Sequence, residues 1–421
     1  MTSPPDRARG NGSRPSGPPK LPPLHCPRCG AAAEDLSGCA PCRAEGVGVN
    51  PVPPPADLSG LSLADFPGGP WGWPSAMPVP GPPVTLGEGA TPHLALEGPN
   101  GSNGADGADG TGLWLKYEGA NPTGSHKDRA MAVGAAAARA AGADTVVAAS
   151  SGNAGASAAA YAARAGLRCV IFTTDRVPGP LRAQIDALGA IRVVRRDLAA
   201  RNAAMREAVE RFGWYPLTSF VAPSPGGNGY ANEGYKSVAY EIARDFGDRA
   251  GTVVVPTSRA DLLAGIGRGF RELREAGLLG RLPRLVAAEP AGAAPFTAAL
   301  ARAGRAEQER VRVASVPSPA FSLGEETPCW QGLDALWRSD GSAVAVPTED
   351  FMAEHRALGA GGIFLEPSSA VAVAAARGLA REHRDGAVIA IGTATGLKDT
   401  ASVAGAGAAA AGLPELAELT A

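Results

Sequence analysis

Short apolar runs alternate with alanine-rich helical stretches along most of this chain, from Leu113 onward. The run at 145–149 precedes the stretch 154–166, the run at 167–173 precedes 181–189, and 252–255 precedes 262–276. This repeated order of strand and helix predicts an α/β chain. Runs such as 253–255 and 387–391 are continuously apolar, as expected for parallel strands that helices cover on both faces. Binding sites are then expected at the carboxyl ends of the strands.

Length and charge exclude several classes of function. The 421 residues are enough to bury two domain cores, and 39 basic against 41 acidic residues give no basic surface for nucleic acid or a membrane. No apolar stretch reaches the roughly 18 residues that a membrane-spanning helix needs. The first 20 residues lack the apolar core of a secretory signal. We therefore expect a cytoplasmic protein with neither nucleic-acid nor membrane partners.

Glycine (56) and proline (38) are concentrated in three places. Residues 1–24 combine proline with few apolar side chains, which predicts a disordered tail. Residues 48–84 are also rich in proline but contain Phe66, Trp71 and Trp73, which predicts an irregular arm packed on a core. Residues 99–112 are mainly Gly, Asn, Asp and Ser between apolar runs, which predicts a long hairpin loop.

Two Cys-x-x-Cys pairs near the start, separated by nine residues, predict a metal site formed by Cys26, Cys29, Cys39 and Cys42. Each pair can offer two thiolates to one tetrahedral Zn²⁺. Disulfides or redox thiols are the alternative, less favoured in a cytoplasmic chain with only two other cysteines. Four thiolates leave no open position on the metal, so we expect a structural zinc ribbon over 25–47. Binding of a partner or of nucleic acid by such a ribbon is a further alternative, which the overall charge disfavours.

A lysine and a glycine-punctuated turn indicate where chemistry takes place. The turn Asn-Pro-Thr-Gly at 121–124 leads into a helix expected to start near Asp128, which places Lys127 at the helix entrance. A lone lysine there is ordinarily just solvated. The sequence Ser-Ser-Gly-Asn-Ala-Gly-Ala at 150–156, however, directly follows the apolar run 146–149. A strand, such a turn and a helix form a cradle for an anion or a cofactor.

Together these two motifs resemble the fold type II enzymes that use pyridoxal phosphate (PLP), and most closely the threonine synthase-like family. Further motifs agree with that family in order along the chain, at 86–92, 115–121, 233–241, 363–370 and 392–399. The resemblance covers about residues 60–405, and an N-terminal zinc ribbon also occurs among threonine synthase-like proteins. It implies an α/β fold with two open, mostly parallel sheets with helices on both faces, preceded by the ribbon. It further implies a large PLP domain over 85–129 and 224–410, a small domain over 130–223, and a homodimer.

The resemblance also implies roles for individual residues. Lys127 would be the catalytic residue and would attach PLP covalently, Asn153 would hydrogen-bond the ring hydroxyl group, and Thr393 would face the ring nitrogen. The alternative for Thr393 is a strand-end hydroxyl that satisfies a local backbone group. The amino-acid substrate would be bound by Ser150, Ser151, Gly152, Ala154 and Thr123.

The chain departs from the family pattern where the PLP phosphate is expected. In place of a run of glycines after strand 252–255, the sequence reads Thr-Ser-Arg-Ala-Asp at 257–261. The loop opens a helix whose free N–H groups attract an anion. The hydroxyls of Thr257 and Ser258 and the guanidinium of Arg259 would then replace glycine contacts, with Ala260 and Asp261 completing the loop. The alternative is a solvated Arg259.

Two substitutions bear on the substrate. Threonine synthases usually carry an arginine just before the Glu-Gly-x-Lys segment, where this chain has Ala231. The residue before the lysine is His126, which resembles the tryptophan synthase β subunit. The sequence therefore leaves three alternatives open: formation of threonine from O-phosphohomoserine, β-replacement on an O-activated serine, and a catalytically silent relative that binds PLP or a partner.

Overall fold

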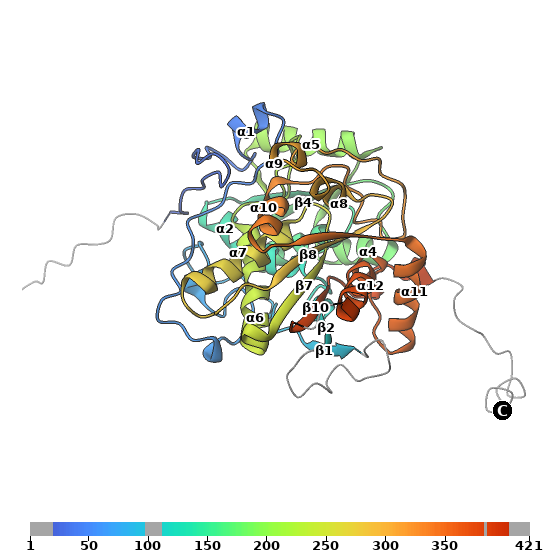
Figure 1. Cartoon of the computed structure of the whole chain (residues 1–421). Helices are drawn as coiled ribbons and strands as arrows, with labels where there is room; N and C mark the ends of the chain where they lie inside the picture. The colour runs from blue at the N-terminus through green and yellow to red at the C-terminus, as the bar shows by residue number, and fades with distance from the viewer. Residues whose placement is uncertain (1–19, 97–111, 383–384, 404–421) are drawn as a thin grey trace, which may run out of the picture.

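A computed structural model describes residues 20–96, 112–382 and 385–403 of the chain. Its larger sheet has the strand order β1-β2-β10-β7-β8-β9 (Figure 1). Neighbouring strands run parallel except β1 and β2. The strands are β1 (His93–Leu96), β2 (Leu113–Tyr117), β7 (Ala250–Pro256), β8 (Arg284–Pro290), β9 (Ser342–Val346) and β10 (Ala387–Gly392).

The second sheet has four parallel strands in the order β5-β4-β3-β6. They are β3 (Thr145–Ala149), β4 (Arg168–Thr173), β5 (Ile191–Val194) and β6 (Tyr215–Pro216). The helices between them are α3 (Asn153–Ala165), α4 (Gly179–Ala187) and α5 (Leu198–Phe212). The predicted fold class, α/β with two mostly parallel sheets, is confirmed.

Helices cover both faces of the larger sheet, which explains why its strands are continuously apolar. Val253 and Val255 of β7 share one core with α6 (Lys236–Phe246) and α7 (Asp261–Glu275). Val254, which points to the opposite face, belongs to a core with α12 (Pro367–Glu382). Successive residues of a strand point to opposite faces, so the run 253–255 of β7 is buried on both faces and is apolar throughout.

Helix α2 (Lys127–Ala140) begins one residue before the predicted start and is almost entirely buried. Its alanines allow close packing against α3 and the 3-10 turn η4 (Ala231–Tyr235). The remaining helices of the described chain are α1 (Ala40–Ala44), α8 (Pro295–Leu300), α9 (Arg305–Gln308), α10 (Trp330–Arg338) and α11 (Thr348–Ala360).

The proline-rich arm packs on helix α6 through its aromatic side chains. The rings of Phe66 and Trp73 lie 4.7 Å apart between centroids, and both contact Tyr240. The last residues of the predicted tail, 20–24, are among the described residues. Leu24 is buried, and the backbone oxygen of Pro22 accepts a hydrogen bond from Tyr230. Burial of the Leu24 side chain in the core therefore stabilises the end of this proline-rich segment.

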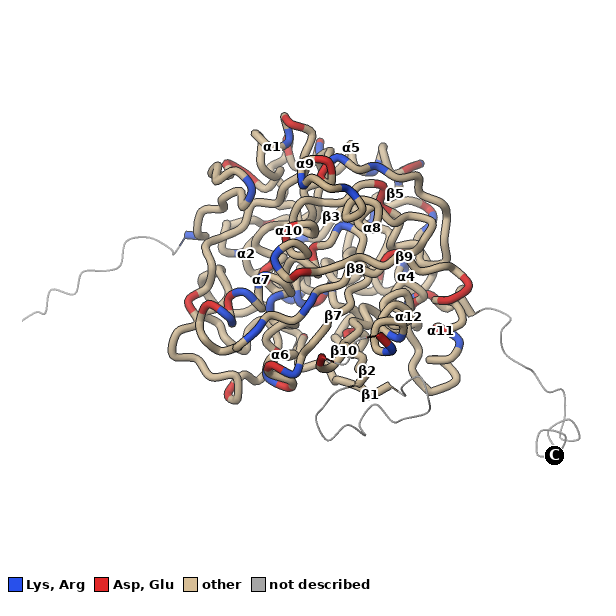
Figure 2. The backbone as a smooth tube through the Cα atoms, in the orientation of Figure 1, with Lys and Arg blue, Asp and Glu red and all other residues tan. Residues whose placement is uncertain are grey.

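The predicted tail at 1–19, the hairpin loop at 99–111 and the stretch 404–410 lie outside the described residues. Strands β1 and β2, which flank that loop, form an antiparallel pair. Basic and acidic residues are interspersed along the described backbone (Figure 2). None of the described helices has the length and apolar character needed to cross a membrane.

Candidate active site

Lys127 is the first residue of α2, and its side chain is half-buried. Its amine Nζ donates a hydrogen bond to the hydroxyl of Tyr235 at 3.2 Å. Burial lowers the pKa of Lys127, while nearby Asp261 raises it and Arg259 lowers it. A lowered pKa increases the share of neutral amine, which is the nucleophilic form.

His126 holds this helix start against the end of strand β10. Its backbone N–H donates to the carbonyl oxygen of Thr393 at 2.9 Å, and its ring Nδ1 lies 3.2 Å from the same oxygen. The ring also packs on Tyr235, with centroids 5.7 Å apart. Burial lowers the pKa of His126 well below its ordinary value, so the ring is neutral at physiological pH.

Asn153, the first residue of α3, faces a carboxylate from a distant part of the chain. Its side-chain N–H group donates to both oxygens of Glu366, at 3.1 and 3.2 Å. Burial raises the pKa of Glu366 to about 7, although Asn153 and Lys398 lower it. This pair joins the start of α3 to the start of α12.

Three buried polar atoms in segments that meet near the start of α2 have no hydrogen-bond partner among the described residues: Ser125 Oγ, Asn153 Oδ1 and Lys398 Nζ. Their segments adjoin, because Ser125 pairs with Ala394 and Glu366 N–H donates to the carbonyl of Ala394. Burial also lowers the pKa of Lys398 to about 8. Buried polar atoms are normally paired, so such a group of unpaired atoms fits a polar ligand. These residues therefore fit the ring end of PLP.

Thr393 directly follows strand β10, and its hydroxyl lies 2.9 Å from the hydroxyl of Ser369. It thus bonds a side chain rather than a local backbone group. The structure places Thr393 against His126, the residue before Lys127, and the predicted role of Thr393 at the ring nitrogen stays a prediction.

The turn before α3 is fixed by the hydroxyl of Ser150, which accepts N–H groups of Gly152 and Gly155 at 3.2 and 3.0 Å. Ser151 Oγ lies 3.2 Å from the hydroxyl of Thr173. Gly152 is the N-cap of α3, and Ala154 lies in the first turn of that helix.

Thr123 differs from the other residues predicted to bind substrate. Its N–H and its hydroxyl both donate to the carboxylate of Asp128, at 2.6 and 2.5 Å. Those two donors stabilise the turn that leads into α2. The hydroxyl of Thr123 is therefore already used within the protein.

The loop before α7 presents a mixed set of groups. The hydroxyl of Thr257 donates to the backbone oxygen of Val255 at 2.7 Å, so it closes the strand end. Ser258 is half-buried. Arg259 donates to Glu325 at 2.7 Å and to the hydroxyl of Ser224 at 3.1 Å. Ser258 and Arg259 remain the donors that an anion can use.

The end of this loop is shaped by a buried carboxylate. Ala260 has a left-handed φ of 55° at the N-cap of α7. The carboxylate of Asp261 accepts the N–H of Gly227 with both oxygens, each at 3.0 Å, and the side-chain amide of Asn232 at 2.9 Å. The carboxylate of Asp261 thus fixes the loop around Gly227, and this side chain offers no hydrogen-bond donor to an anion.

The sequence did not point to three residues of the site: Tyr235, which contacts Lys127, Glu366, which contacts Asn153, and Lys398, whose charge acts on His126. Each lies within a motif quoted for the family resemblance, and membership of those motifs is the signal that could have found them.

Ala231 is buried, and the space between its side chain and Gly134 of α2 is tight. Position 231 therefore supplies no cation to the site.

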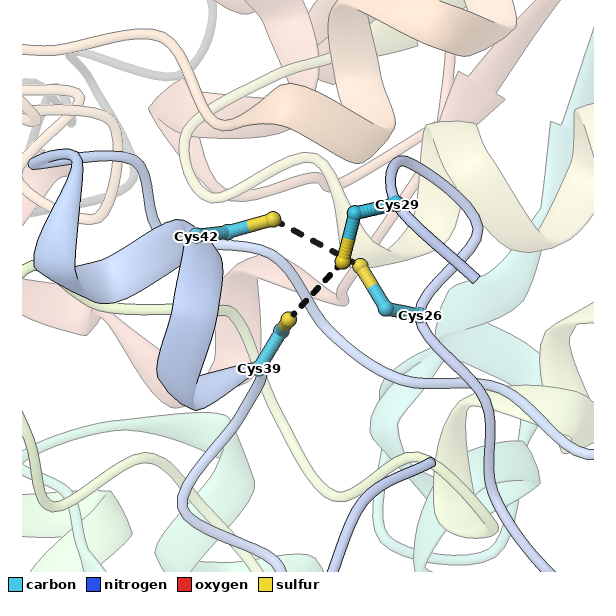
Figure 3. Close-up of side chains that lie close together, drawn as sticks. All are labelled: Cys26, Cys29, Cys39 and Cys42. Carbon is cyan, nitrogen blue, oxygen red and sulfur yellow. Dashed lines mark hydrogen bonds between the residues drawn. The ribbon is translucent and has the colours of Figure 1, made fainter. Parts of the chain in front are cut away.

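The four cysteines of the N-terminal segment converge as predicted (Figure 3). The sulfurs of Cys26 and Cys42 lie 3.7 Å apart, those of Cys29 and Cys39 lie 3.5 Å apart, and all four lie within 4.8 Å of one another. Zinc–sulfur bonds of about 2.3 Å in a tetrahedron separate the sulfurs by about 3.8 Å. The cluster could therefore hold one zinc ion.

Comparison with known proteins decides the family. The model of the pyridoxal-phosphate dependent enzyme family matches residues 84–393. The chain belongs to this family. Within it, the protein is similar to the threonine synthase of Methanocaldococcus jannaschii, with 33% identity over 298 residues, 68% of this chain and 71% of that protein. It is also similar to the threonine synthase of Methanosarcina acetivorans, with 31% identity over 340 residues, 79% of this chain and 81% of that protein.

Solved structures of the PLP-dependent family share the fold. O-Ureido-L-serine synthase superposes with a TM-score of 0.60 at 24% identity, covering 86% of this chain and 99% of that one. The processed form of threonine deaminase isoform 2 from Solanum lycopersicum gives a TM-score of 0.60 at 21% identity, covering 70% of this chain and 82% of that one. Because these identities are low, the two structures inform the fold alone.

Proposed function

We propose that this PLP-dependent lyase is of threonine synthase type and forms threonine from O-phosphohomoserine or acts on a related activated amino acid. One observation carries the proposal: Lys127 is half-buried at a helix start, where segments with three buried polar atoms that have no partner in the described chain meet. The threonine synthase relatives support the same reaction class.

Lys127 would hold the cofactor covalently and, once released by the substrate, would move the proton at the substrate Cα. PLP, when bound, supplies an electron sink for negative charge at that carbon. Burial favours the neutral amine that both tasks require. The hydroxyl of Tyr235, which accepts a hydrogen bond from this amine, would orient the Lys127 side chain.

Asn153 would bind the cofactor's ring hydroxyl group, and Glu366 would fix the orientation of the Asn153 amide. Thr393 would face the ring nitrogen with an uncharged hydroxyl. The turn formed by Ser150, Ser151 and Gly152, with Ala154 after it, would bind the substrate carboxylate. Backbone N–H groups at the start of α3 are suited to an anion.

Ser258 and Arg259 would bind the cofactor phosphate. Arg259 supplies a charge-assisted hydrogen bond, the stronger kind. Cys26, Cys29, Cys39 and Cys42 would bind a structural Zn²⁺, since four thiolates close its coordination shell. A cytoplasmic location and a homodimer stay predictions.

The second candidate is a β-replacement on an O-activated serine. Two observations favour it: position 231 supplies no cation for a substrate phosphate, and His126, the residue before Lys127, packs on Tyr235. A silent relative that binds PLP or a partner is the third candidate.

One experiment separates these candidates. Purified protein is examined for an absorption band of bound PLP that borohydride removes. It is then incubated with O-phosphohomoserine, O-phosphoserine, O-acetylserine, serine and threonine, and the products are identified. Threonine from O-phosphohomoserine supports the first candidate, and a replacement product from O-acetylserine supports the second. Bound PLP without turnover of any substrate supports the silent relative.

A further inference from the structure

The four-cysteine segment, residues 24–52, lies in direct backbone contact with the loop 223–229. A Cβ atom on Gly48 would lie 2.3 Å from the carbonyl oxygen of Ser224, and one on Gly38 would lie 2.8 Å from the side chain of Pro225. Such distances leave no room for a side chain at Gly48. The two segments are therefore packed as closely as backbones allow.

A chain of hydrogen bonds continues this contact toward the candidate active site. The side-chain amide of Asn50, which is 5% exposed, donates to the carbonyl oxygen of Gly227 at 2.9 Å. The N–H of the same Gly227 donates to both oxygens of Asp261, the first residue of α7. Through Gly227, Asn50 thus connects the four-cysteine segment to Asp261 at the start of α7.

A second route joins the same elements. Trp330 of α10 packs in one apolar cluster with Cys26, Cys39 and Cys42. The next residue, Gln331, donates its side-chain amide to the carbonyl of Pro225 at 2.7 Å. The hydroxyl of Ser224 in turn accepts a hydrogen bond from Arg259. Both routes end at 259–261, beside Lys127, whose pKa responds to Arg259 and Asp261.

We propose that the four-cysteine segment positions Arg259 for the cofactor by holding the loop 223–229, which binds Asp261 at the start of α7, with Asn50 as the positioning residue. A metal held by the four thiolates would fix the segment, and the segment contacts the loop through Asn50 and Gly48. This inference rests on the proposed cofactor site for its effect on PLP, but the mechanical coupling itself does not depend on PLP.

Removal of the Asn50 donor tests the coupling. Asn50→Ala leaves the carbonyl of Gly227 without its side-chain partner, and Asn50→Asp keeps the size but offers no donor. Both variants should retain any bound zinc. Asn50→Ala should weaken PLP binding about five- to tenfold, the value of one neutral hydrogen bond. Asn50→Asp, which also places a carboxylate against a carbonyl oxygen, should weaken it at least as much. Amide hydrogen exchange in 224–232, measured without PLP, should accelerate by a similar factor. Asp35→Ala, which removes an exposed hydrogen bond in the same segment, should match the parent in both measurements.

Gly48→Ala provides a steric test that leaves the donor set unchanged. Its new methyl group must displace Ser224, so it should accelerate the same exchange and weaken PLP binding. Unchanged exchange in both Asn50 variants and in Gly48→Ala would overturn the coupling. Faster exchange with unchanged PLP affinity would overturn the link to the cofactor. A parent protein that binds no PLP would contradict the proposed function, while the exchange data would still decide the coupling.

Discussion

At the scale of single residues, Lys127 differs from the buried Lys116 and Lys236 in what surrounds its amine. Lys116 lies 2.5 Å from Glu241, and Lys236 lies 2.8 Å from Glu233, so both are held in buried ion pairs. The amine of Lys127 contacts only a neutral hydroxyl in the hydrogen bonds of the described chain. An amine without a paired carboxylate loses its proton at lower cost.

Lys127→Ala should therefore lower turnover by about 10²–10⁴-fold or more, since Lys127 is the amine that we propose moves the proton at Cα. In the parent protein, borohydride reduction followed by mass spectrometry should find the pyridoxyl group on Lys127. The exposed Lys20→Ala serves as the control and should keep both properties. A pyridoxyl group on Lys116 or Lys236 would refute the assignment.

Glu366 should make folding stability depend on pH. Burial raises its pKa from the ordinary 4.5 to about 7, so the folded state retains a proton that the unfolded state has released. The resulting stabilisation is fully present below pH 4.5 and is lost as the pH rises through about 7. Glu366→Gln should remove this loss. The free energy of unfolding, measured in urea at several pH values, should fall less steeply over this range than in the parent. If the free energy of unfolding changes equally with pH in the two proteins, Glu366 does not titrate in this range. Glu349→Gln, at an exposed site, is the control and should show the same pH dependence as the parent.

At the scale of structural elements, the loop before α7 replaces a glycine run with side chains that are partly engaged already. Thr257 closes the end of β7, Asp261 fixes Gly227, and Arg259 pairs with Glu325. The guanidinium is the cation that this loop can offer to an anion. It also lies at the start of a 15-residue helix, whose dipole favours negative charge there.

Arg259→Ala should weaken PLP binding by about ten- to a hundredfold, because one charge-assisted hydrogen bond contributes about 1.5–3 kcal/mol. Titration of the PLP-free protein, followed by absorbance, gives the dissociation constant. Arg312→Ala removes an arginine of an exposed ion pair and should bind PLP like the parent. If only the Michaelis constant of the substrate rises, Arg259 acts on the substrate instead.

At the scale of the whole molecule, the cluster of four cysteines joins the N-terminal segment to the α/β core. Arg28 links it to both Glu45 and Glu309, while Trp330 packs against the cysteines. A metal there would stabilise a segment with little regular secondary structure. Small segments of this kind depend on such links because they bury little apolar surface.

Metal analysis should find one zinc ion per chain, and Cys29→Ser should lose most of it along with several degrees of thermal stability. Cys169→Ser, at a buried cysteine outside the cluster, should keep its zinc. Purified parent protein without stoichiometric zinc would disprove a structural zinc site.

The sequence by itself determined the α/β class, because continuously apolar strands alternating with alanine-rich helices can be buried only in a sheet covered on both faces. It also indicated Lys127, the turn at 150–153 and the four cysteines, since each is a local pattern with a chemical reason. Only the tertiary structure decided which distant residues meet them. Glu366 bonds Asn153 across 213 positions, and Asn50 bonds Gly227 across 177. Such pairs are set by how helices and loops pack around the sheets, and no short stretch of sequence specifies that packing.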